Sequence, residues 1–242
     1  MKFRPVKQNR IAIGIVNQLK DAIFSGQFKS GERIPTEREL TEHFQVSRVV
    51  VREAVRELEI RGLVKILQGP TGGAYVADLT FDQLNNALLD LFLCNKLSVA
   101  ELIQTRILIE MEIARLAATR VNAEFARRLQ EALDAEAFED LSHAEFVFNR
   151  LMVHKILAEM CGNRLLQAIA SSLHRLIGEL LLEVKPVNKI IHRQEEHAEI
   201  VYAILAGNTS GAEEAMKKHL SSVGKKLIQL EEAYRKRKKL TL

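Results

Sequence analysis

The chain has 242 residues, of which 47% are hydrophobic and 27% charged, with 12 glycines, 4 prolines and no tryptophan. This composition excludes a disordered chain and is typical of a globular protein dominated by helix. No uncharged apolar run approaches the roughly 18 residues of a membrane span, and the basic N-terminus lacks a cleavage site, so we expect no transmembrane segment and no signal peptide. Two cysteines, Cys94 and Cys161, are too few for a disulfide framework, which favours a reducing cytoplasm.

The net charge of +4 is distributed unevenly along the chain. Residues 1–78 carry a net charge of +4, residues 79–216 carry −7 and residues 217–242 carry +7. A segment that contacts phosphates needs positive charge, because neutralising phosphates releases their counter-ions. The N-terminal section is therefore a candidate for nucleic-acid contact, although an excess of this size also occurs on ordinary protein surfaces.

Three helices and a hairpin are predicted at the N-terminal end. Apolar residues at three- and four-residue steps predict the first helix, the pair Thr36 and Glu39 matches a capping box, and Ser47 is the predicted cap of the third helix. Two short strands are predicted around the loop QGPTGG. The predicted elements are helices over residues 8–25, 36–44 and 47–62 and strands over residues 63–67 and 74–78. This order is typical of a winged helix-turn-helix, whose second paired helix lies in the DNA major groove.

Two arginines, Arg48 and Arg52, lie one turn apart on the exposed face of that helix. Guanidinium groups bind guanine edges or phosphates, so this face is expected to contact DNA. The alternative is that both arginines form surface salt bridges with Glu53 and Glu57. The agreement of turn, cap, helix and wing favours the DNA-binding interpretation.

The chain from Thr80 onward is predicted to be helical. The expected helices cover residues 80–94, 98–120, 122–138, 142–161, 163–184, 187–206 and 208–235. No repeat of fixed period is present, so an all-helical bundle is the simplest packing. The predicted organisation is a winged helix-turn-helix domain over 1–78, a helical-bundle domain over 79–235 and a basic tail over 236–242.

Three histidines, His154, His197 and His219, lie on the apolar faces of three predicted helices. A lone histidine in such a place is usually a hydrogen-bonded core residue, but three together with Arg106, which has Glu110 as a pairing partner one turn away, predict a polar internal cavity. Ligands of a divalent metal such as Zn or Ni converge in this way in bundle cores. The other histidines are interpreted as structural or surface residues, with His174 the one that could border the cavity: His43, His143, His174 and His192.

The stretch SGERIPTERELTEHFQVSRVVVREAVRELEIRGLVKILQGPTGGAYV resembles the DNA-binding domain of GntR-family bacterial transcription regulators. The helical remainder resembles the FCD ligand-binding domain of the FadR subfamily. The motifs that carry this second resemblance are RILIE from Arg106, the segment from His154 to Asn163, Glu196-His197 followed by AILAGN, and MKKHL, which contains His219. The resemblance implies a homodimer that binds a palindromic double-stranded DNA operator and changes its grip when a small molecule enters the helical domain.

The resemblance also implies roles for individual residues. The implied DNA contacts are Arg38, Arg48 and Arg52, with Thr36 and Ser47 near phosphates, and a wing from Gly69 to Gly73 that includes Gly72. His154, His197 and His219 match the three histidines that hold a divalent metal in many members. Arg106 matches a pocket arginine suited to a carboxylate effector.

One position departs from the family's pattern. Metal-binding members supply an aspartate on the helix of the first histidine, whereas here Arg150 lies one turn before His154. Asn149 would point roughly 140° away, at about 100° per residue. Two alternatives are open: a metal held by three histidines with water or an acid as further ligands, or a metal-free cavity in which Arg106 and Arg150 clamp an anion directly.

The sequence thus predicts a cytoplasmic, dimeric regulator, a repressor rather than an activator, that is controlled by a small organic acid and is not an enzyme. The first rival is a metal-dependent hydrolase with an accessory DNA-binding domain, in which three histidines activate water. Against it, no general base is evident, although Glu196 adjoins His197, and the patterns GxGxxG, GxSxG and HExxH are absent. The second rival is an architectural protein that compacts DNA and senses nothing.

Overall fold

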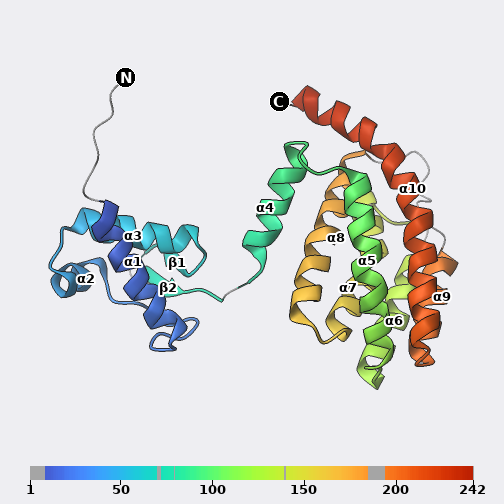
Figure 1. Cartoon of the computed structure of the whole chain (residues 1–242), viewed down its shortest axis with the longest axis horizontal. Coiled ribbons are helices and arrows are strands. Elements are labelled where there is room, and N and C mark those ends of the chain that lie inside the picture. The colour runs from blue at the N-terminus through green and yellow to red at the C-terminus, as the bar shows by residue number, and fades with distance from the viewer. Residues whose placement is uncertain (1–8, 70–71, 79, 139, 185–193, 242) are drawn as a thin grey trace. The chain divides into compact units, whose positions relative to one another are not determined.

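The computed structural model describes residues 9–69, 72–78, 80–138, 140–184 and 194–241 (Figure 1). The chain divides into two compact units, Met1–Gln83 and Leu84–Leu242. Each unit contains its own cluster of buried apolar side chains. As predicted, the chain is mainly helical, with a winged helix-turn-helix followed by an all-helical bundle.

The first unit contains α1 (Asn9–Phe24), α2 (Glu37–Phe44), α3 (Arg48–Ile60), β1 (Val64–Leu67) and β2 (Gly73–Val76). The predicted capping box is confirmed, because the Thr36 side chain accepts a hydrogen bond from the Glu39 N–H and the Glu39 carboxylate accepts one from the Thr36 N–H. Gln45 ends α2 in the left-handed region, with a φ of 52°, which turns the chain sharply toward α3. The two strands pair in antiparallel register and form the wing.

The N-terminus of α3 corrects one prediction. Ser47 occupies the N-cap position, but its side chain makes no capping hydrogen bond. The reason is that the Val50 N–H already bonds to the Ser47 carbonyl oxygen at 3.1 Å. The Ser47 hydroxyl is therefore not needed to begin the helix.

The second unit consists of seven helices within the described residues: α4 (Asp82–Leu93), α5 (Val99–Ala118), α6 (Ala123–Glu136), α7 (His143–Met160), α8 (Arg164–Val184), α9 (Gln194–Leu205) and α10 (Thr209–Thr241). Capping boxes begin two of them, built from Ser98 with Glu101 at α5 and from Ser142 with Glu145 at α7. α5 is the central helix, because it packs against α7, α8, α9 and α10. Figure 1 shows α5 running beside α10 along the bundle.

The interior of the bundle is not uniformly apolar. Two clusters of buried aliphatic and aromatic side chains fill most of it. Among them lies a group of buried polar side chains contributed by six helices, α5 to α10: Arg106, Glu110, Glu136, His154, Ser172, His174, His197 and His219. Because buried polar groups are costly unless they are paired, this group of side chains is a candidate functional site.

The C-terminal half of the bundle differs in detail from the predicted elements. The helix predicted over 187–206 is described from Gln194 onward, and its earlier part lies outside the described residues. α10 continues to Thr241, into the segment predicted as a basic tail. Arg235 near this end donates hydrogen bonds to the carbonyl oxygens of Phe92 (2.6 Å) and Leu97 (2.7 Å), which tie α10 to the end of α4 and to the turn that follows it.

One described helix, α8, is long and apolar enough to cross a membrane by length and hydropathy alone. However, 56% of its apolar window is buried inside the bundle. The helix also carries His174, Arg175 and Glu179. These features are those of a core helix.

Candidate functional site

The exposed face of α3 presents Arg48 and Arg52, the two arginines expected to contact DNA. Arg52 donates hydrogen bonds to the Glu37 carboxylate, with the shortest contact at 3.1 Å, rather than to Glu53 or Glu57. Within the described residues Arg48 has no carboxylate partner. Both side chains are exposed. To reach a phosphate or a base, Arg52 would have to break its ion pair with Glu37, whereas Arg48 would not have to break one.

The other residues expected at the DNA surface belong to the same unit. Arg38 is exposed and lies 3.9 Å from Glu42, a weak surface pair. The Thr36 hydroxyl is engaged in the capping box of α2, whereas the Ser47 hydroxyl has no capping role. Their contacts with phosphates remain predictions.

Gly72 in the wing has a steric reason to be glycine, because a Cβ there would lie 2.7 Å from the Gly69 carbonyl oxygen. A Cβ at Gly73 would meet the end of the Arg33 side chain, and Gly73 has a φ of 155°. Arg33 also donates a hydrogen bond to the Gly72 carbonyl oxygen at 2.6 Å. These glycines shape the tip of the wing, and their contact with a minor groove remains a prediction.

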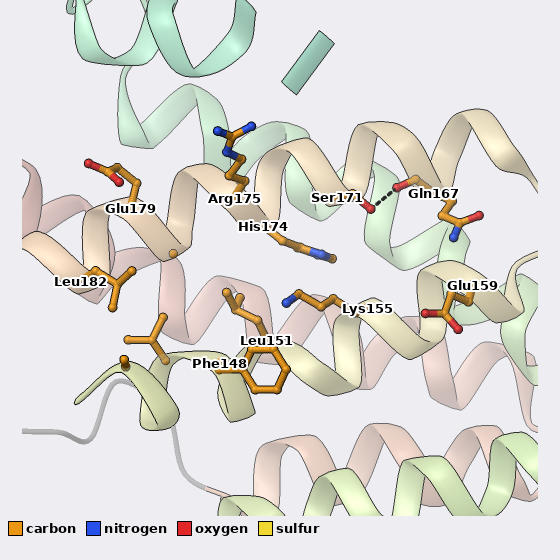
Figure 2. Close-up of a pocket in the computed structure, with 13 residues that line it drawn as sticks. Phe148, Leu151, Lys155, Glu159, Gln167, Ser171, His174, Arg175, Glu179 and Leu182 are labelled. Atoms are coloured by element: carbon orange, nitrogen blue, oxygen red, sulfur yellow. Dashed lines mark hydrogen bonds between the residues drawn. The ribbon is translucent and has the colours of Figure 1, made fainter. Parts of the chain in front are cut away.

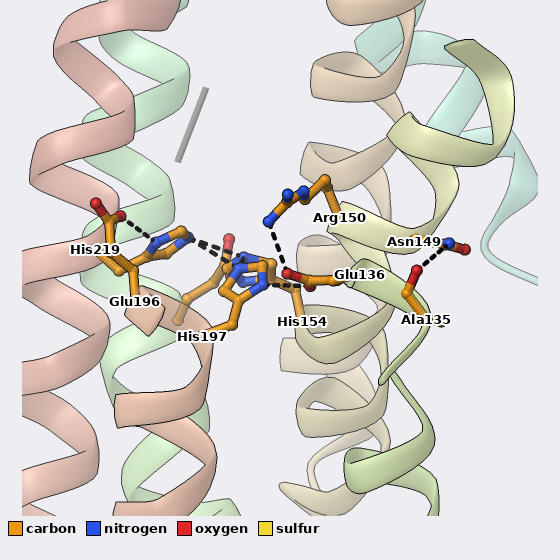
Figure 3. Close-up of polar contacts among 9 residues, drawn as sticks. Ala135, Glu136, Asn149, Arg150, His154, Glu196, His197 and His219 are labelled. Atoms are coloured by element: carbon orange, nitrogen blue, oxygen red, sulfur yellow. Dashed lines mark hydrogen bonds and ion pairs between the residues drawn. The ribbon is translucent and has the colours of Figure 1, made fainter. Parts of the chain in front are cut away.

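The structure brings His154, His197 and His219 together in the interior of the bundle (Figure 3). Their Nε2 atoms face one another, with His154–His197 3.1 Å apart and the other two pairs 3.2 Å apart. The three side chains are buried. Helices α7, α9 and α10 therefore each contribute one ring nitrogen to a common point.

Each of these rings is held from its other side by a glutamate. The Nδ1–H of His154 donates to Glu110 at 2.5 Å, and that of His219 donates to Glu196 at 3.1 Å. The Nδ1–H of His197 donates to Glu136. A carboxylate at Nδ1 fixes the proton there, so all three Nε2 atoms present lone pairs to the common point.

Both arginines of the predicted anion clamp are already paired with these glutamates. Arg106 donates to Glu110 at 2.5 Å, which confirms the predicted pair. Arg150 donates to Glu136 at 2.9 Å, a contact that the sequence did not predict. Each of these two glutamates thus orients one histidine and neutralises one arginine.

The protonation states follow from this arrangement. Burial lowers the pKa of His154 and of His197 well below the ordinary value, despite the raising effect of nearby glutamate, so both rings are neutral at pH 7. Burial alone would raise the pKa of Glu110, but Arg106 and the neighbouring histidines hold it well below its usual range. His154 and His197 are therefore neutral imidazoles, and Glu110 is an anion.

The donor set fits a divalent metal. Three imidazole Nε2 atoms whose Nδ1 sides face carboxylates point their lone pairs at one another, and a cation at their centre stabilises this arrangement. Metal–nitrogen bonds of about 2.1 Å separate donors by about 3.0 Å in octahedral and about 3.4 Å in tetrahedral coordination. The observed spacings of 3.1 and 3.2 Å lie between these limits. His154, His197 and His219 are thus the residues that could hold the ion.

Asn149 of α7 and Glu136 of α6 lie on neighbouring helices that flank the site. Asn149 is turned away, as expected, and donates a hydrogen bond to the Ala135 carbonyl oxygen at 2.9 Å (Figure 3). Glu136 was missed. The spacing of residues along α6 could have indicated that Glu136 is buried, because it continues the stripe formed by Leu129, Ala132 and Leu133.

The remaining histidines differ in their surroundings. His43 is exposed, and His143 pairs with the Leu181 carbonyl oxygen at 2.8 Å. His174 is buried next to His154, and its Nε2 lies 3.3 Å from Glu110. His192 lies outside the described residues.

A winged helix-turn-helix unit joined to an all-helical unit is typical of a class of protein, the DNA-binding regulators. The family models agree with this class: residues 12–76 match the bacterial regulatory proteins of the gntR family, and residues 101–222 match the FCD domain. The chain belongs to the GntR family of transcription regulators and carries an FCD domain.

Its relatives bear names of the same class. The chain is 33% identical to the HTH-type transcriptional regulator LutR of Bacillus subtilis over 83% of its own length and 94% of the relative's. It is 31% identical to the HTH-type transcriptional repressor NanR of Cronobacter sakazakii, over 91% of this chain and 86% of that one. A solved structure of Streptococcus agalactiae GntR matches 89% of this chain and 99% of its own, with 26% identity and a TM-score of 0.64.

Proposed function

We propose that this regulator is a cytoplasmic repressor that binds a palindromic operator as a homodimer and responds to a small carboxylate bound beside a metal in the helical domain. The observation that carries the sensor part is the triangle of Nε2 atoms with a glutamate behind each ring. That arrangement supports a divalent metal on His154, His197 and His219. When bound, the metal would supply a Lewis acid to a ligand oxygen.

The charge of the site supports an anionic effector. Two buried ion pairs, Glu110 with Arg106 and Glu136 with Arg150, balance their own charge. A divalent ion on the three histidines would therefore add positive charge inside the bundle. A carboxylate beside the ion would neutralise part of that charge, and burial makes such neutralisation valuable.

The size of the cavity supports a coupled change in shape. The space beside the cluster has a volume of about 20 Å³ and is lined by both arginines and by apolar side chains of α7, α8 and α10. A space of this size holds about one water molecule. An organic acid would therefore enter only when the surrounding helices separate, which gives the ligand a preference for one packing of the bundle over another.

The rival functions lack such support. Glu110, Glu136 and Glu196 bond to the Nδ1 side of the histidines, so these carboxylates do not face the Nε2 point where a water would be activated. A hydrolase would have to show turnover that disappears in His197→Ala. An architectural protein would bind DNA without sequence preference and with a steep dependence on salt.

The test of the sensor begins with metal analysis of the purified protein. We expect one divalent ion per chain, lost in His197→Ala and retained in His43→Ala, which changes an exposed histidine. Operator affinity is then measured, on a duplex selected by the protein from a random pool, against a panel of small carboxylates. An effective acid should change the affinity by about 5- to 150-fold. Acids that bind without changing operator affinity would overturn the proposal.

The DNA surface is tested with the same duplex. Arg48→Ala should weaken binding by about 1–3 kcal/mol, because an arginine contact to a base edge or phosphate is lost. Arg127→Ala, an exposed arginine of α6 in the other unit, is the control and should leave the affinity unchanged. Equal loss in both variants would show that only overall charge matters.

A further inference from the structure

A second cavity lies outside the histidine cluster, between α7 and α8. It is an open groove of about 520 Å³ (Figure 2). Volumes of this size are typical of small-molecule sites. Its apolar lining includes Val147, Phe148 and Leu151 of α7 and Leu182 of α8. Its polar lining includes Lys155, Glu159, His174, Arg175 and Glu179.

Most of the charged side chains along the groove have partners. Glu159 accepts a hydrogen bond from Arg128 at 2.6 Å, and Arg175 donates one to the Asn86 side chain at 2.8 Å. Glu179 also has a polar interaction. The groove is therefore not a uniformly charged surface. Two of its groups, Lys155 and His174, have a polar atom without a partner among the described residues.

Lys155 is one of the unmatched groups. No carboxylate of the described residues lies within ion-pair distance of its amino group, which instead lies 4.7 Å from the centre of the Phe148 ring. The Lys155 side chain is partly buried. An ammonium group that has lost part of its hydration without gaining a counter-ion favours an anion beside it.

His174 is the second such group, because its Nδ1 has no partner among the described residues. The ring is 1% exposed, and its Nε2 lies 3.3 Å from the Glu110 carboxylate. Figure 2 shows the ring extending from α8 toward α7, into the groove that Lys155 enters from the other side. Buried polar atoms are nearly always hydrogen-bonded, so this ring favours an occupant of the groove that offers a polar atom.

We propose that the groove binds a small carboxylate with an apolar ring or branched chain. The carboxylate lies at the end marked by Lys155 and His174, and the apolar body packs against Phe148, Leu151 and Leu182. This site is separate from the one in the proposed function, since it shares neither the three metal-binding histidines nor Arg106 and Arg150.

The test measures binding of phenylpropionate, with phenylpropanol as the uncharged probe of the same shape, by titration calorimetry on the full chain. We expect one molecule of phenylpropionate per chain and at least tenfold weaker binding of the alcohol. Lys155→Met, which keeps the length of the side chain, should weaken binding of the acid about tenfold. Lys218→Met, at an exposed lysine paired with Glu199, is the control and should bind as the parent does.

Further variants separate this site from the histidine cluster. Phenylpropionate should still bind to His197→Ala and in the presence of a chelator, whether or not the metal site exists. Binding that survives in Lys155→Met but is lost in His197→Ala would place the acid at the cluster and overturn the proposal. Absence of binding, combined with dissociation of dimers by Phe148→Asp in sedimentation, would also overturn it and identify the groove as an interface between copies.

Discussion

In the buried cluster Glu110 contacts His154, His174 and Arg106, and Glu136 contacts His197 and Arg150. The ion pair between Glu136 and Arg150 explains how this chain tolerates an arginine at the position where metal-binding relatives are expected to supply an aspartate. Glu136 neutralises Arg150, so the guanidinium group does not face the ring nitrogens as an uncompensated charge. The same carboxylate keeps the proton of His197 on Nδ1, away from the metal position.

Glu136→Gln should therefore affect both stability and metal binding. Arg150 would remain largely buried beside a neutral amide, and we expect unfolding to become easier by roughly 2–4 kcal/mol in the presence of chelator. Metal affinity should fall about 10- to 100-fold, because His197 loses its orienting carboxylate. Denaturant unfolding and competitive metal titration measure the two effects.

The matched control is Glu131→Gln on the same helix. Glu131 pairs with Arg127 at the surface, where such pairs contribute little, so both quantities should stay close to the parent values. Unchanged metal affinity in Glu136→Gln would show that Glu136 has no part in positioning His197.

The residues of the site were only partly predictable. His154, His197, His219, Arg106 and Glu110 were found because each lies on the apolar stripe of its own helix, which is a local pattern. The pairing of Glu136 with Arg150 depends on how α6 packs against α7, and no spacing within one helix encodes that contact. A buried glutamate on an apolar stripe was nevertheless visible at position 136.

At the scale of single elements, capping boxes begin three helices, α2, α5 and α7. At α7, hydrogen bonds from the Ser142 side chain and backbone lower the pKa of Glu145. A carboxyl whose pKa is lowered by folding stabilises the fold fully above its unfolded pKa, and this contribution is lost as the pH falls through the folded pKa.

Ser142→Ala should lower the free energy of unfolding by about 1 kcal/mol at neutral pH, because the first turn of α7 loses its cap. The variant should also lose less stability on acidification than the parent, since the hydroxyl no longer stabilises the Glu145 carboxylate. Urea unfolding at a series of pH values below about 5 measures both effects. Ser221→Ala, at an exposed position of α10, is the control, and an acid dependence identical to the parent's in Ser142→Ala would contradict this account.

Capping signals also explain which elements were predictable. The starts of α2, α5 and α7 follow from Thr36, Ser98 and Ser142, whose partners lie three residues away in the sequence. The course of α10 beyond residue 235 did not follow from the sequence. Its basic run suggests a solvated tail, but Arg235 is fixed by carbonyl oxygens at the far end of the chain's first bundle helix, a tertiary contact.

At the scale of the whole molecule, the chain has one hydrophobic core in Met1–Gln83 and two further clusters in Leu84–Leu242. The proposed metal ligands all belong to the second unit. A ligand stabilises only the unit whose unfolding releases it, by about 2.7 kcal/mol at a hundredfold excess over its dissociation constant.

Calorimetry of the full chain should therefore show two unfolding transitions, and zinc should raise the midpoint temperature of one of them. Chelator should lower the midpoint temperature of that same transition and leave the other transition unchanged. His197→Ala should abolish the response to zinc while retaining the transition of the DNA-binding unit. A zinc response of both transitions together would show that the two units unfold as one.

The long helix α10 has a mechanical consequence. It carries His219 in its first half and Arg235 in its second, separated by roughly 24 Å at about 1.5 Å per residue. His219 belongs to the histidine cluster, and Arg235 donates hydrogen bonds to the carbonyl oxygens of Phe92 in α4 and Leu97 in the turn that follows α4. A helix is stiff along its axis, so a shift of His219 along the axis of α10 would also displace Arg235 and the end of α4 that it contacts.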